Sequence, residues 1–152
     1  MRNYVIGCDN AAVYLKDALK AYAENLGAQV EDVGCFSSSD PEVYPNIAKR
    51  VCDRVIESHY ETFGILVCGT GLGMAMTANK FKGIRAGVVH DVFSAERLAL
   101  SNKGNVICFG ERVVGVELAK KCLQAWMGLE FQDGPSTPKV QAICDIEART
   151  MK

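Results

Sequence analysis

Residues 64–74 read Gly-Ile-Leu-Val-Cys-Gly-Thr-Gly-Leu-Gly-Met, an apolar run that ends at a cysteine and a glycine-rich turn. The apolar run is typical of a strand buried on both faces, and the turn leads into a helical pattern. This order places the thiol of Cys68 at the carboxyl end of a parallel strand, beside the free N–H groups of a helix N-terminus. A thiol next to an anion-binding turn is a catalytic arrangement, so we expect the chain to perform chemistry on a small molecule.

The same strand-then-helix pattern recurs along the whole chain. We predict strands at residues 3–8, 28–33, 63–67, 84–89 and 105–109, and helices at 13–26, 72–81, 93–100, 116–126 and 139–148. A further helix, N-capped by Ser39 or Asp40, is predicted to end near residue 57. The alternation predicts an α/β fold, a three-layer sandwich of a five-stranded parallel sheet with helices on both faces. The last helix has no sixth strand to pair with, so we expect it to pack on a partner subunit.

Length and composition exclude several functional classes. The 152 residues suit a single domain over 1–152, and the composition (49% hydrophobic, 23% charged, net charge −1) is ordinary for a globular protein. No basic block provides a nucleic-acid footprint, and no apolar run approaches the roughly 20 residues of a membrane span. The beginning of the sequence shows no signal-peptide pattern, so we expect a cytoplasmic protein. Seven cysteines without a CxxC pair or zinc spacing argue against disulfides and a metal site.

The glycine turn has three possible interpretations. Gly69-Thr70-Gly71-Leu72-Gly73 matches a dinucleotide fingerprint only in part, since Met76 stands where another glycine is needed and no Walker lysine follows. The turn could also be purely structural. The interpretation as an anion hole is favoured because the turn directly follows a thiol.

Ligands bind at the carboxyl ends of strands in such sheets, and four of these ends carry polar side chains. They are Cys8-Asp9-Asn10, Cys68-Gly69-Thr70, His90-Asp91 and Gly110-Glu111-Arg112. Cys68 is either an inert core thiol or a base, and Thr70 either caps a helix or orients the substrate. Asp9 either caps the helix that begins near residue 13 or accepts hydrogen bonds from sugar hydroxyls. His90 is a candidate for the border of the pocket.

Short motifs extend this pattern over essentially the whole chain. They are Gly7-Cys8-Asp9, Tyr44-Pro45, the glycine turn, Ala78-Asn79-Lys80, Gly83-Ile84-Arg85-Ala86, Asn105-Val106, Gly110-Glu111-Arg112-Val113-Val114-Gly115 and Val140-Gln141-Ala142-Ile143. Together they resemble the family of type B ribose-5-phosphate isomerases and galactose-6-phosphate isomerases. The resemblance implies a Rossmann-like fold, a homodimer or tetramer with active sites at the subunit interface, and neither a metal nor an organic cofactor.

The resemblance also implies a reaction, in which an aldose phosphate and a ketose phosphate interconvert through a cis-enediolate. In it, Cys68 is the base that moves a proton between C1 and C2, and Thr70 assists proton transfer at the oxygens. The implied enediolate hole consists of the backbone amides of Gly69, Gly71 and Gly73. The implied substrate-binding residues are Asp9, Asn10, Tyr44, Ser101, Asn102 (across the dimer interface), Arg112 (near the phosphate) and Lys139.

Three departures from the family's pattern shape the expected substrate. Asn10 and Ser101 stand where the family commonly has histidines, the second of which opens the sugar ring. The phosphate-binding arm, residues 133–139, reads Asp-Gly-Pro-Ser-Thr-Pro-Lys and keeps only Lys139 as a cation. Serine cannot act as a proton acceptor at neutral pH, and proline cannot bind phosphate as arginine does. We therefore expect poor turnover of ribose 5-phosphate, and a substrate that is open-chain, shorter, or held differently at its far end.

Two alternatives remain open. In galactose-6-phosphate isomerase two unlike subunits share the work, and this chain has the features of a half that carries the cysteine and lacks the histidine. It could also be a non-catalytic homologue that binds a sugar phosphate. Retention of Cys68, Thr70 and the three glycines favours an aldose–ketose isomerase.

Overall fold

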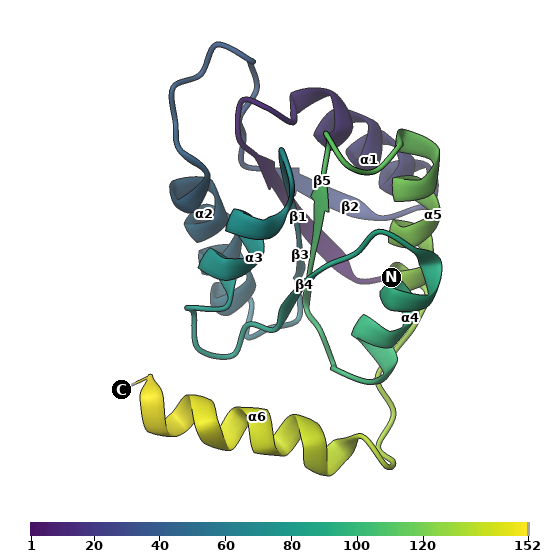
Figure 1. The fold of residues 1–152 in the computed structure, drawn as a ribbon. Helices are drawn as coiled ribbons and strands as arrows, with labels where there is room; N and C mark the ends of the chain where they lie inside the picture. The colour runs from purple at the N-terminus through teal and green to yellow at the C-terminus, as the bar shows by residue number, and fades with distance from the viewer. Residues whose placement is uncertain (152) are drawn as a thin grey trace.

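The protein folds around one parallel sheet whose strands are separated in sequence by helices (Figure 1). The computed structural model describes residues 1–151. The strands are β1 (Asn3–Cys8), β2 (Gln29–Asp32), β3 (Phe63–Cys68), β4 (Ala86–Val88) and β5 (Val106–Gly110). The helices are α1 (Val13–Asn25), α2 (Tyr44–Glu57), α3 (Leu72–Ala78), α4 (Val92–Leu100), α5 (Val116–Met127) and α6 (Thr137–Thr150).

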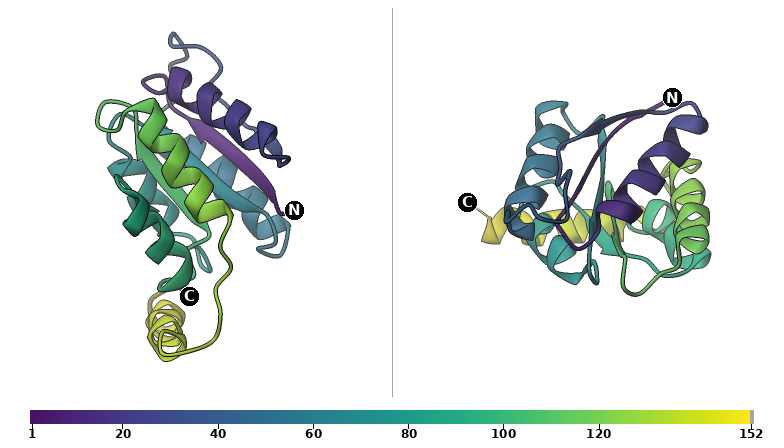
Figure 2. Two further views of the ribbon diagram at one scale, coloured as in Figure 1. Left: turned by 90° about the vertical axis from the view of Figure 1, so that its right-hand side faces the viewer. Right: turned by 90° about the horizontal axis from the view of Figure 1, so that it is seen from above.

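The sheet forms the middle of three layers. Its strand order is β2-β1-β3-β5-β4, and all neighbours pair in parallel. Helices α2 and α3 cover one face, and α1, α5 and α4 cover the other (Figures 1 and 2). Strands β1, β3 and β5 are almost entirely buried, as apolar strands with helices on both sides must be. The predicted five-stranded α/β sandwich is therefore confirmed.

Helix α6 stands apart from these layers. It lies below the edge at which the strands begin (Figure 1). Cys68, the last residue of β3, lies at the opposite edge. Helix α6 carries one buried residue, Val140, and two of its large apolar side chains, Ile143 and Ile146, are about half exposed. The helix begins at Thr137 and ends at Thr150, so it is longer than the 139–148 expected from the sequence.

The predicted N-cap of α2 was wrong, and the structure also decides between the two interpretations of Asp9 as a cap or a free carboxylate. Helix α2 begins at Tyr44 after Val43, with a proline in its first turn, and Asp40 instead accepts the Glu42 N–H at 2.9 Å. The N-cap of α1 is Ala12, because the carboxylate of Asp9 accepts the N–H of Ala11 at 3.0 Å and closes a local turn before the helix. Asp9 therefore does not serve as the helix cap.

Helix α3 and strand β4 are shorter than expected. The helix ends at Ala78 rather than at residue 81, and the strand covers 86–88 rather than 84–89. The side chain of Asn79 accepts the Ala86 N–H at 2.8 Å and donates to the Ala86 carbonyl at 2.9 Å. These two bonds hold the connection as a turn, because they replace backbone pairing that would extend either element.

A buried ion pair joins α1 to the end of β2. Lys16 is fully buried, and its Nζ lies 2.8 Å from Asp32 and donates to the Cys35 carbonyl at 2.6 Å. Lys16 lies on the helix face that otherwise carries Leu15, Leu19 and Ala23 into the core. Its ammonium therefore fixes the start of the loop that leads to α2.

We expect Lys16→Met to lower the free energy of unfolding by about 3–5 kcal/mol, because it leaves the Asp32 carboxylate buried without its partner. Urea unfolding followed by circular dichroism measures this loss. The double variant Lys16→Met/Asp32→Leu should regain most of it. The matched control is Lys20→Met, which breaks an exposed helical pair with Glu24 and should cost less than about 1 kcal/mol. Equal losses for Lys16→Met and Lys20→Met would contradict the role of the buried pair.

Candidate active site

The centre of the candidate site is the turn between β3 and α3. Cys68 is the last residue of β3 and retains about 5% exposure, and its sulfur accepts the Gly71 N–H at 3.1 Å. The sulfur therefore faces the glycine turn rather than the interior of the sheet. The N–H groups of Gly69 and Gly73 donate to no protein acceptor within residues 1–151. The turn thus has unsatisfied donors beside the thiol of a residue that is about 5% exposed, as an anion site requires.

Two glycines allow this turn to lie directly on strand β5. Gly71 has φ of 82°, and a Cβ there would lie 3.0 Å from the Phe109 carbonyl carbon. A Cβ on Gly110 would lie 2.6 Å from the backbone of Thr70. Any larger residue at either position would push the turn away from β5. The backbone also ties the two segments together, because the Glu111 and Arg112 amides donate to the carbonyls of Cys68 (2.9 Å) and Gly69 (3.0 Å).

Two other cysteines near Cys68 are more deeply buried than Cys68 itself. Cys8 ends strand β1, and Cys108 lies on β5. Burial raises the pKa of Cys8 to about 12 and raises the pKa of Cys108 well above its ordinary value. Both thiols are completely inaccessible. Neither can serve as a base at neutral pH, and of these three cysteines Cys68 is the one that retains any exposure.

Tyr44 and Arg112 flank the turn on its two sides. The ring of Tyr44, at the start of α2, lies directly against Gly73, so a Cβ at position 73 would displace the ring. The guanidinium of Arg112 lies over Gly69, and a Cβ there would be 3.4 Å from its Nη1. Both side chains are exposed on their outer sides. An aromatic wall and a cation therefore border the free amides.

The end of β1 supplies the next polar groups. Asp9 follows Cys8, and its N–H donates to the Val67 carbonyl at 3.3 Å, which holds it beside the end of β3. Asn10 points to the long loop before α2 and donates to the Asp40 carbonyl at 2.8 Å. Thr70 is exposed, and its hydroxyl accepts the Leu72 N–H at 3.3 Å, which leaves its own proton free to donate. The structure thus gathers Asp9, Thr70 and Asn10 on the same edge as Cys68.

Three predicted site residues lie far from Cys68 in the folded chain. Helix α4 begins at the carboxyl edge and runs back toward α6, so Ser101 and Asn102 lie at the far end of the molecule (Figure 1). Ser101 accepts a hydrogen bond from Arg97 at 3.3 Å, and Asn102 borders two hollows beside β4, of about 440 and 350 Å³. Lys139 lies in the first turn of α6. One copy of the chain does not bring these three residues to Cys68.

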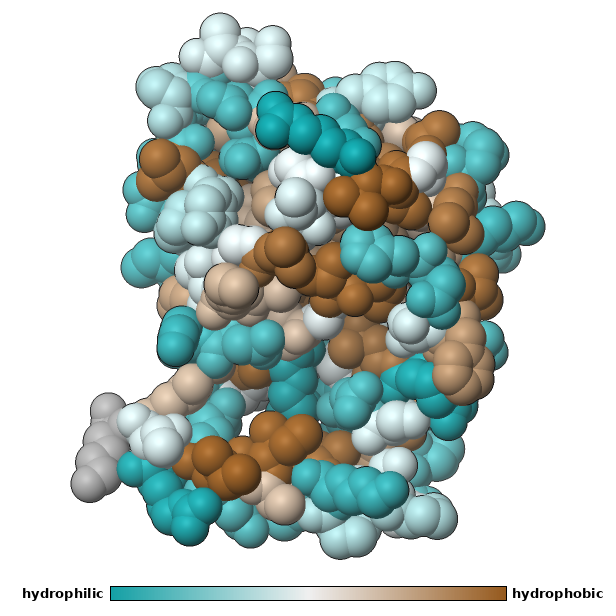
Figure 3. All heavy atoms as spheres, in the orientation of Figure 1, coloured by the Kyte–Doolittle hydropathy of each residue, from teal (hydrophilic) through white to brown (hydrophobic). Residues whose placement is uncertain are grey.

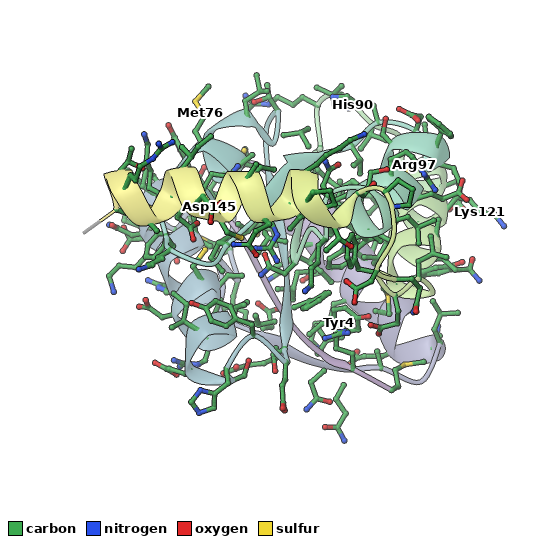
Figure 4. The ribbon with its side chains drawn as sticks, turned by 90° about the horizontal axis from the view of Figure 1, so that it is seen from below. Tyr4, Met76, His90, Arg97, Lys121 and Asp145 are labelled. Carbon is green, nitrogen blue, oxygen red and sulfur yellow. The ribbon has the colours of Figure 1, made fainter. Side chains whose placement is uncertain are left out.

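Glu111 lies at this edge, as the sequence predicts, and the structure shows its hydrogen-bond partner. Its carboxylate accepts the Leu15 N–H at 2.7 Å, which satisfies a free amide in the first turn of α1. The sequence alone could not indicate this hydrogen bond, because Leu15 and Glu111 are 96 residues apart. His90 is exposed beyond the end of β4 (Figure 4). Within residues 1–151, no group of three or more His, Cys, Asp or Glu side chains could hold a metal ion.

Comparison with known proteins identifies the family of this chain. Residues 4–143 match the family described as Ribose/Galactose Isomerase. The chain belongs to this family. A curated relative from Mycolicibacterium smegmatis, D-erythrulose-4-phosphate isomerase 2, is 47% identical, covering 94% of this chain and 95% of the relative. Ribose-5-phosphate isomerase B of Escherichia coli is 40% identical, and the match covers 98% of this chain and 99% of the relative.

A solved structure shows the same fold in this family. The ribose-5-phosphate isomerase B of Clostridium thermocellum superimposes with a TM-score of 0.91 and 33% identity, covering 97% of this chain and 98% of that one. The family resemblance that the motifs indicated is confirmed. The predictions of an aldose–ketose isomerase and of a Rossmann-like fold are confirmed as well. Among residues 1–151, no helix has the length and apolar character to cross a membrane.

The contact between Gly73 and Tyr44 predicts a strong coupling between these two positions. Gly73→Ala should reduce isomerase kcat/KM at least about tenfold, because the new Cβ displaces the Tyr44 ring from the turn. The melting temperature of this variant should not fall below that of the unchanged protein, since alanine is favoured over glycine in a helix by about 1 kcal/mol. In a Tyr44→Ala background the same change should cost almost nothing further. Additive losses in this double-mutant cycle would contradict the proposed contact.

Proposed function

We propose that this chain interconverts a ketotetrose 4-phosphate and the corresponding aldotetrose 4-phosphate, with Cys68 as the base. The observation that carries the proposal is the position of the Cys68 sulfur, which accepts the Gly71 N–H beside the free amides of the glycine turn. The relative from M. smegmatis, whose name specifies D-erythrulose 4-phosphate, supports this choice of substrate. We also propose that the reaction occurs in the cytoplasm, as the sequence predicts.

The reaction transfers one proton between neighbouring carbons. The Cys68 thiolate removes a proton from C1 of the ketose, the C1–H electrons form a C1=C2 bond, and the carbonyl electrons move onto O2. The amides of Gly69 and Gly73 stabilise the negative oxygen of this cis-enediolate. The thiol then returns its proton to C2, while Thr70 carries a proton between the two oxygens. The free hydroxyl proton of Thr70 suits this role, because its oxygen already accepts the Leu72 N–H.

The length of the substrate explains why no ring-opening group is needed. An aldotetrose closes a five-membered ring only through its 4-hydroxyl, and phosphorylation of that hydroxyl removes the nucleophile. Both tetrose phosphates therefore react as open chains. Ser101 stands where the family commonly has the ring-opening histidine, and a pentose phosphate would require that function. A tetrose phosphate does not.

We propose that a second copy of the chain completes each site. Ser101, Asn102 and Lys139 lie away from Cys68 within one copy, and a partner could supply them from its α4 and α6. Apolar side chains on α3 and α4 beside the turn support this assembly: Leu72, Met76 and Phe93 are more than half exposed. Figure 3 shows apolar side chains gathered across this face of the molecule. Such a patch is typical of a surface that a partner covers.

The anionic end of the substrate then lies between two sources of charge. Arg112 lies over Gly69 and supplies a guanidinium from the same copy that holds Cys68. Lys139 of a second copy would supply an ammonium in place of the arginines that the family's arm commonly carries. Lysine binds phosphate as a point charge rather than through a bidentate fork. A shorter substrate brings its phosphate nearer to Arg112, which suits the loss of the arm's arginines.

We expect kcat/KM for D-erythrulose 4-phosphate to exceed that for ribose 5-phosphate at least about tenfold in coupled steady-state assays. Cys68→Ala should lower turnover about 10²- to 10⁴-fold and abolish solvent deuterium incorporation at C2, because it removes the base. Cys52→Ala is the matched control, since this thiol is buried away from the site and burial raises its pKa to about 12. A clear preference for ribose 5-phosphate would refute the proposed substrate. Full deuterium incorporation by Cys68→Ala would refute the proposed base.

The proposed role of position 101 predicts a gain of function. Ser101→His should raise the ratio of ribose 5-phosphate turnover to tetrose phosphate turnover several-fold, because only the pentose needs ring opening. Ser101→Ala is the control and should leave the ratio unchanged. Measured kcat/KM values for both substrates decide the outcome. An equal effect of Ser101→His on both substrates would show that this position does not act in ring opening.

One observation keeps a second candidate function open. Ser101 also matches the cysteine-bearing half of a two-subunit galactose-6-phosphate isomerase. Such a half is inactive alone and recovers activity when its unlike partner is added. Turnover of any tetrose phosphate by the purified chain would exclude this alternative.

A further inference from the structure

A hollow of about 510 Å³ lies at the edge of the sheet opposite Cys68. Its walls come from the beginnings of the strands (Arg2, Phe63 and Asn105), from the segment after α5 that includes Phe131, and from Glu147 of α6. Figure 3 shows the molecule hollowed between α6 and the layers above it, and Figure 4 looks onto this side from below. The volume is within the range of small-molecule binding sites. The reaction proposed above uses none of these residues.

Three cations at this hollow have no acidic partner. Within residues 1–151, Lys82, Arg85 and Lys103 form no ion pair, although seven other lysines and arginines do. Arg2 also borders the hollow, but Glu130 neutralises it at 2.7 Å. Glu147 is the remaining acid of the lining. The hollow therefore carries a net positive charge that attracts an anion.

Hydrogen bonds hold both the side chain and the backbone of Arg85 in place. Its Nε donates to the Lys103 carbonyl at 2.9 Å, and its N–H donates to the side chain of Asn105 at 2.8 Å. Asn105 is 2% exposed, and it donates in turn to the Gly83 carbonyl at 2.9 Å. A buried amide thus fixes the segments that carry Lys82 and Arg85. Hydrogen bonds therefore hold the Arg85 guanidinium and the backbone beside Lys82.

Aromatic rings lie beside the cations. The Lys103 ammonium is 5.4 Å from the centre of the Phe131 ring, and Tyr60 borders the same hollow, where its hydroxyl donates to the Lys82 carbonyl at 3.0 Å. The Phe63 ring is already covered by the Arg2 guanidinium at 3.7 Å. Tyr60 is 39% exposed, so its ring offers a surface for a flat ligand. The more distant Lys103 ammonium leaves room for a ligand against Phe131 only if that lysine turns to the ligand's phosphates.

We propose that this hollow binds a nucleoside phosphate, with its phosphates on Lys82, Arg85 and Lys103 and its base against the rings of Phe131 and Tyr60. Unpaired cations favour the phosphates, and the rings favour a planar base. Strands β3 and β5 begin at this hollow and end at the catalytic turn, so the ligand does not occupy the site of the sugar phosphate. The protein then has a second small-molecule site, which is separate from its isomerase site.

The sole tryptophan reports on this hollow. Trp126 is buried, its ring centre lies 5.7 Å from that of Phe63, and its indole N–H donates to the Gly104 carbonyl at 3.2 Å. Both partners line the hollow. We expect ADP to change Trp126 fluorescence saturably in the full-length protein. Adenosine and inorganic phosphate, used as separate probes, should each bind at least about tenfold more weakly than ADP. Saturating D-erythrulose 4-phosphate should leave ADP binding unchanged.

Two sets of variants test the assignment. Lys82→Ala/Lys103→Gln should raise the Kd for ADP at least about tenfold, and Phe131→Leu should raise it several-fold. The matched control is Lys80→Ala/Lys121→Gln, which removes two exposed charges outside the hollow and should not change the Kd. Circular dichroism verifies that every variant is folded. The proposal is overturned if ADP gives no saturable change at millimolar concentration, if both double variants behave alike, or if the sugar phosphate displaces ADP.

Discussion

The hydrogen bond from the Gly71 amide to the Cys68 sulfur depends on close contact between the glycine turn and the end of β5. The turn reaches the sulfur because position 71 adopts a left-handed backbone and position 110 carries no side chain. The bonds from Glu111 and Arg112 to the carbonyls of Cys68 and Gly69 then fix both segments as one unit. These bonds hold the backbone of Glu111 and Arg112 against the glycine turn. The arrangement of the candidate site therefore rests on backbone packing more than on side-chain charge.

Much of the fold followed from local patterns in the sequence. The strand that ends at Cys68 and the turn after it were correctly predicted, because a buried parallel strand and a glycine turn both depend on nearby residues. The errors fell where a distant or unexpected partner decided the outcome. Asp40 binds the Glu42 amide rather than capping α2, and Asn79 ends α3 by pairing with Ala86. The buried Lys16 could not be recognised, since its partner Asp32 lies on another element.

The candidate site was predictable in part for the same reason. Residues that directly follow strands, such as Asp9, Thr70 and Arg112, share one edge of any parallel sheet, so the sequence alone brought them together. Ser101, Asn102 and Lys139 follow helix α4 or belong to α6, and the direction of α4 carries them to the other edge. The link from Glu111 to the first turn of α1 was also invisible, because it spans 96 residues. The roles of all these side chains, the single domain and the subunit assembly remain predictions.

The two edges of the sheet are built on different physical principles. At the carboxyl edge, strand ends and a helix N-terminus leave amides free, and these donors favour an oxygen whose charge appears only during a reaction. At the amino edge, unpaired side-chain cations stand beside aromatic rings, which suits a ligand that is already charged. Under the proposed function, the replacement of the family's histidine and arginines at the ring-opening and phosphate-binding positions leaves the first edge intact, because its donors are backbone groups. The proposed proton-transfer centre can therefore be retained while the substrate changes.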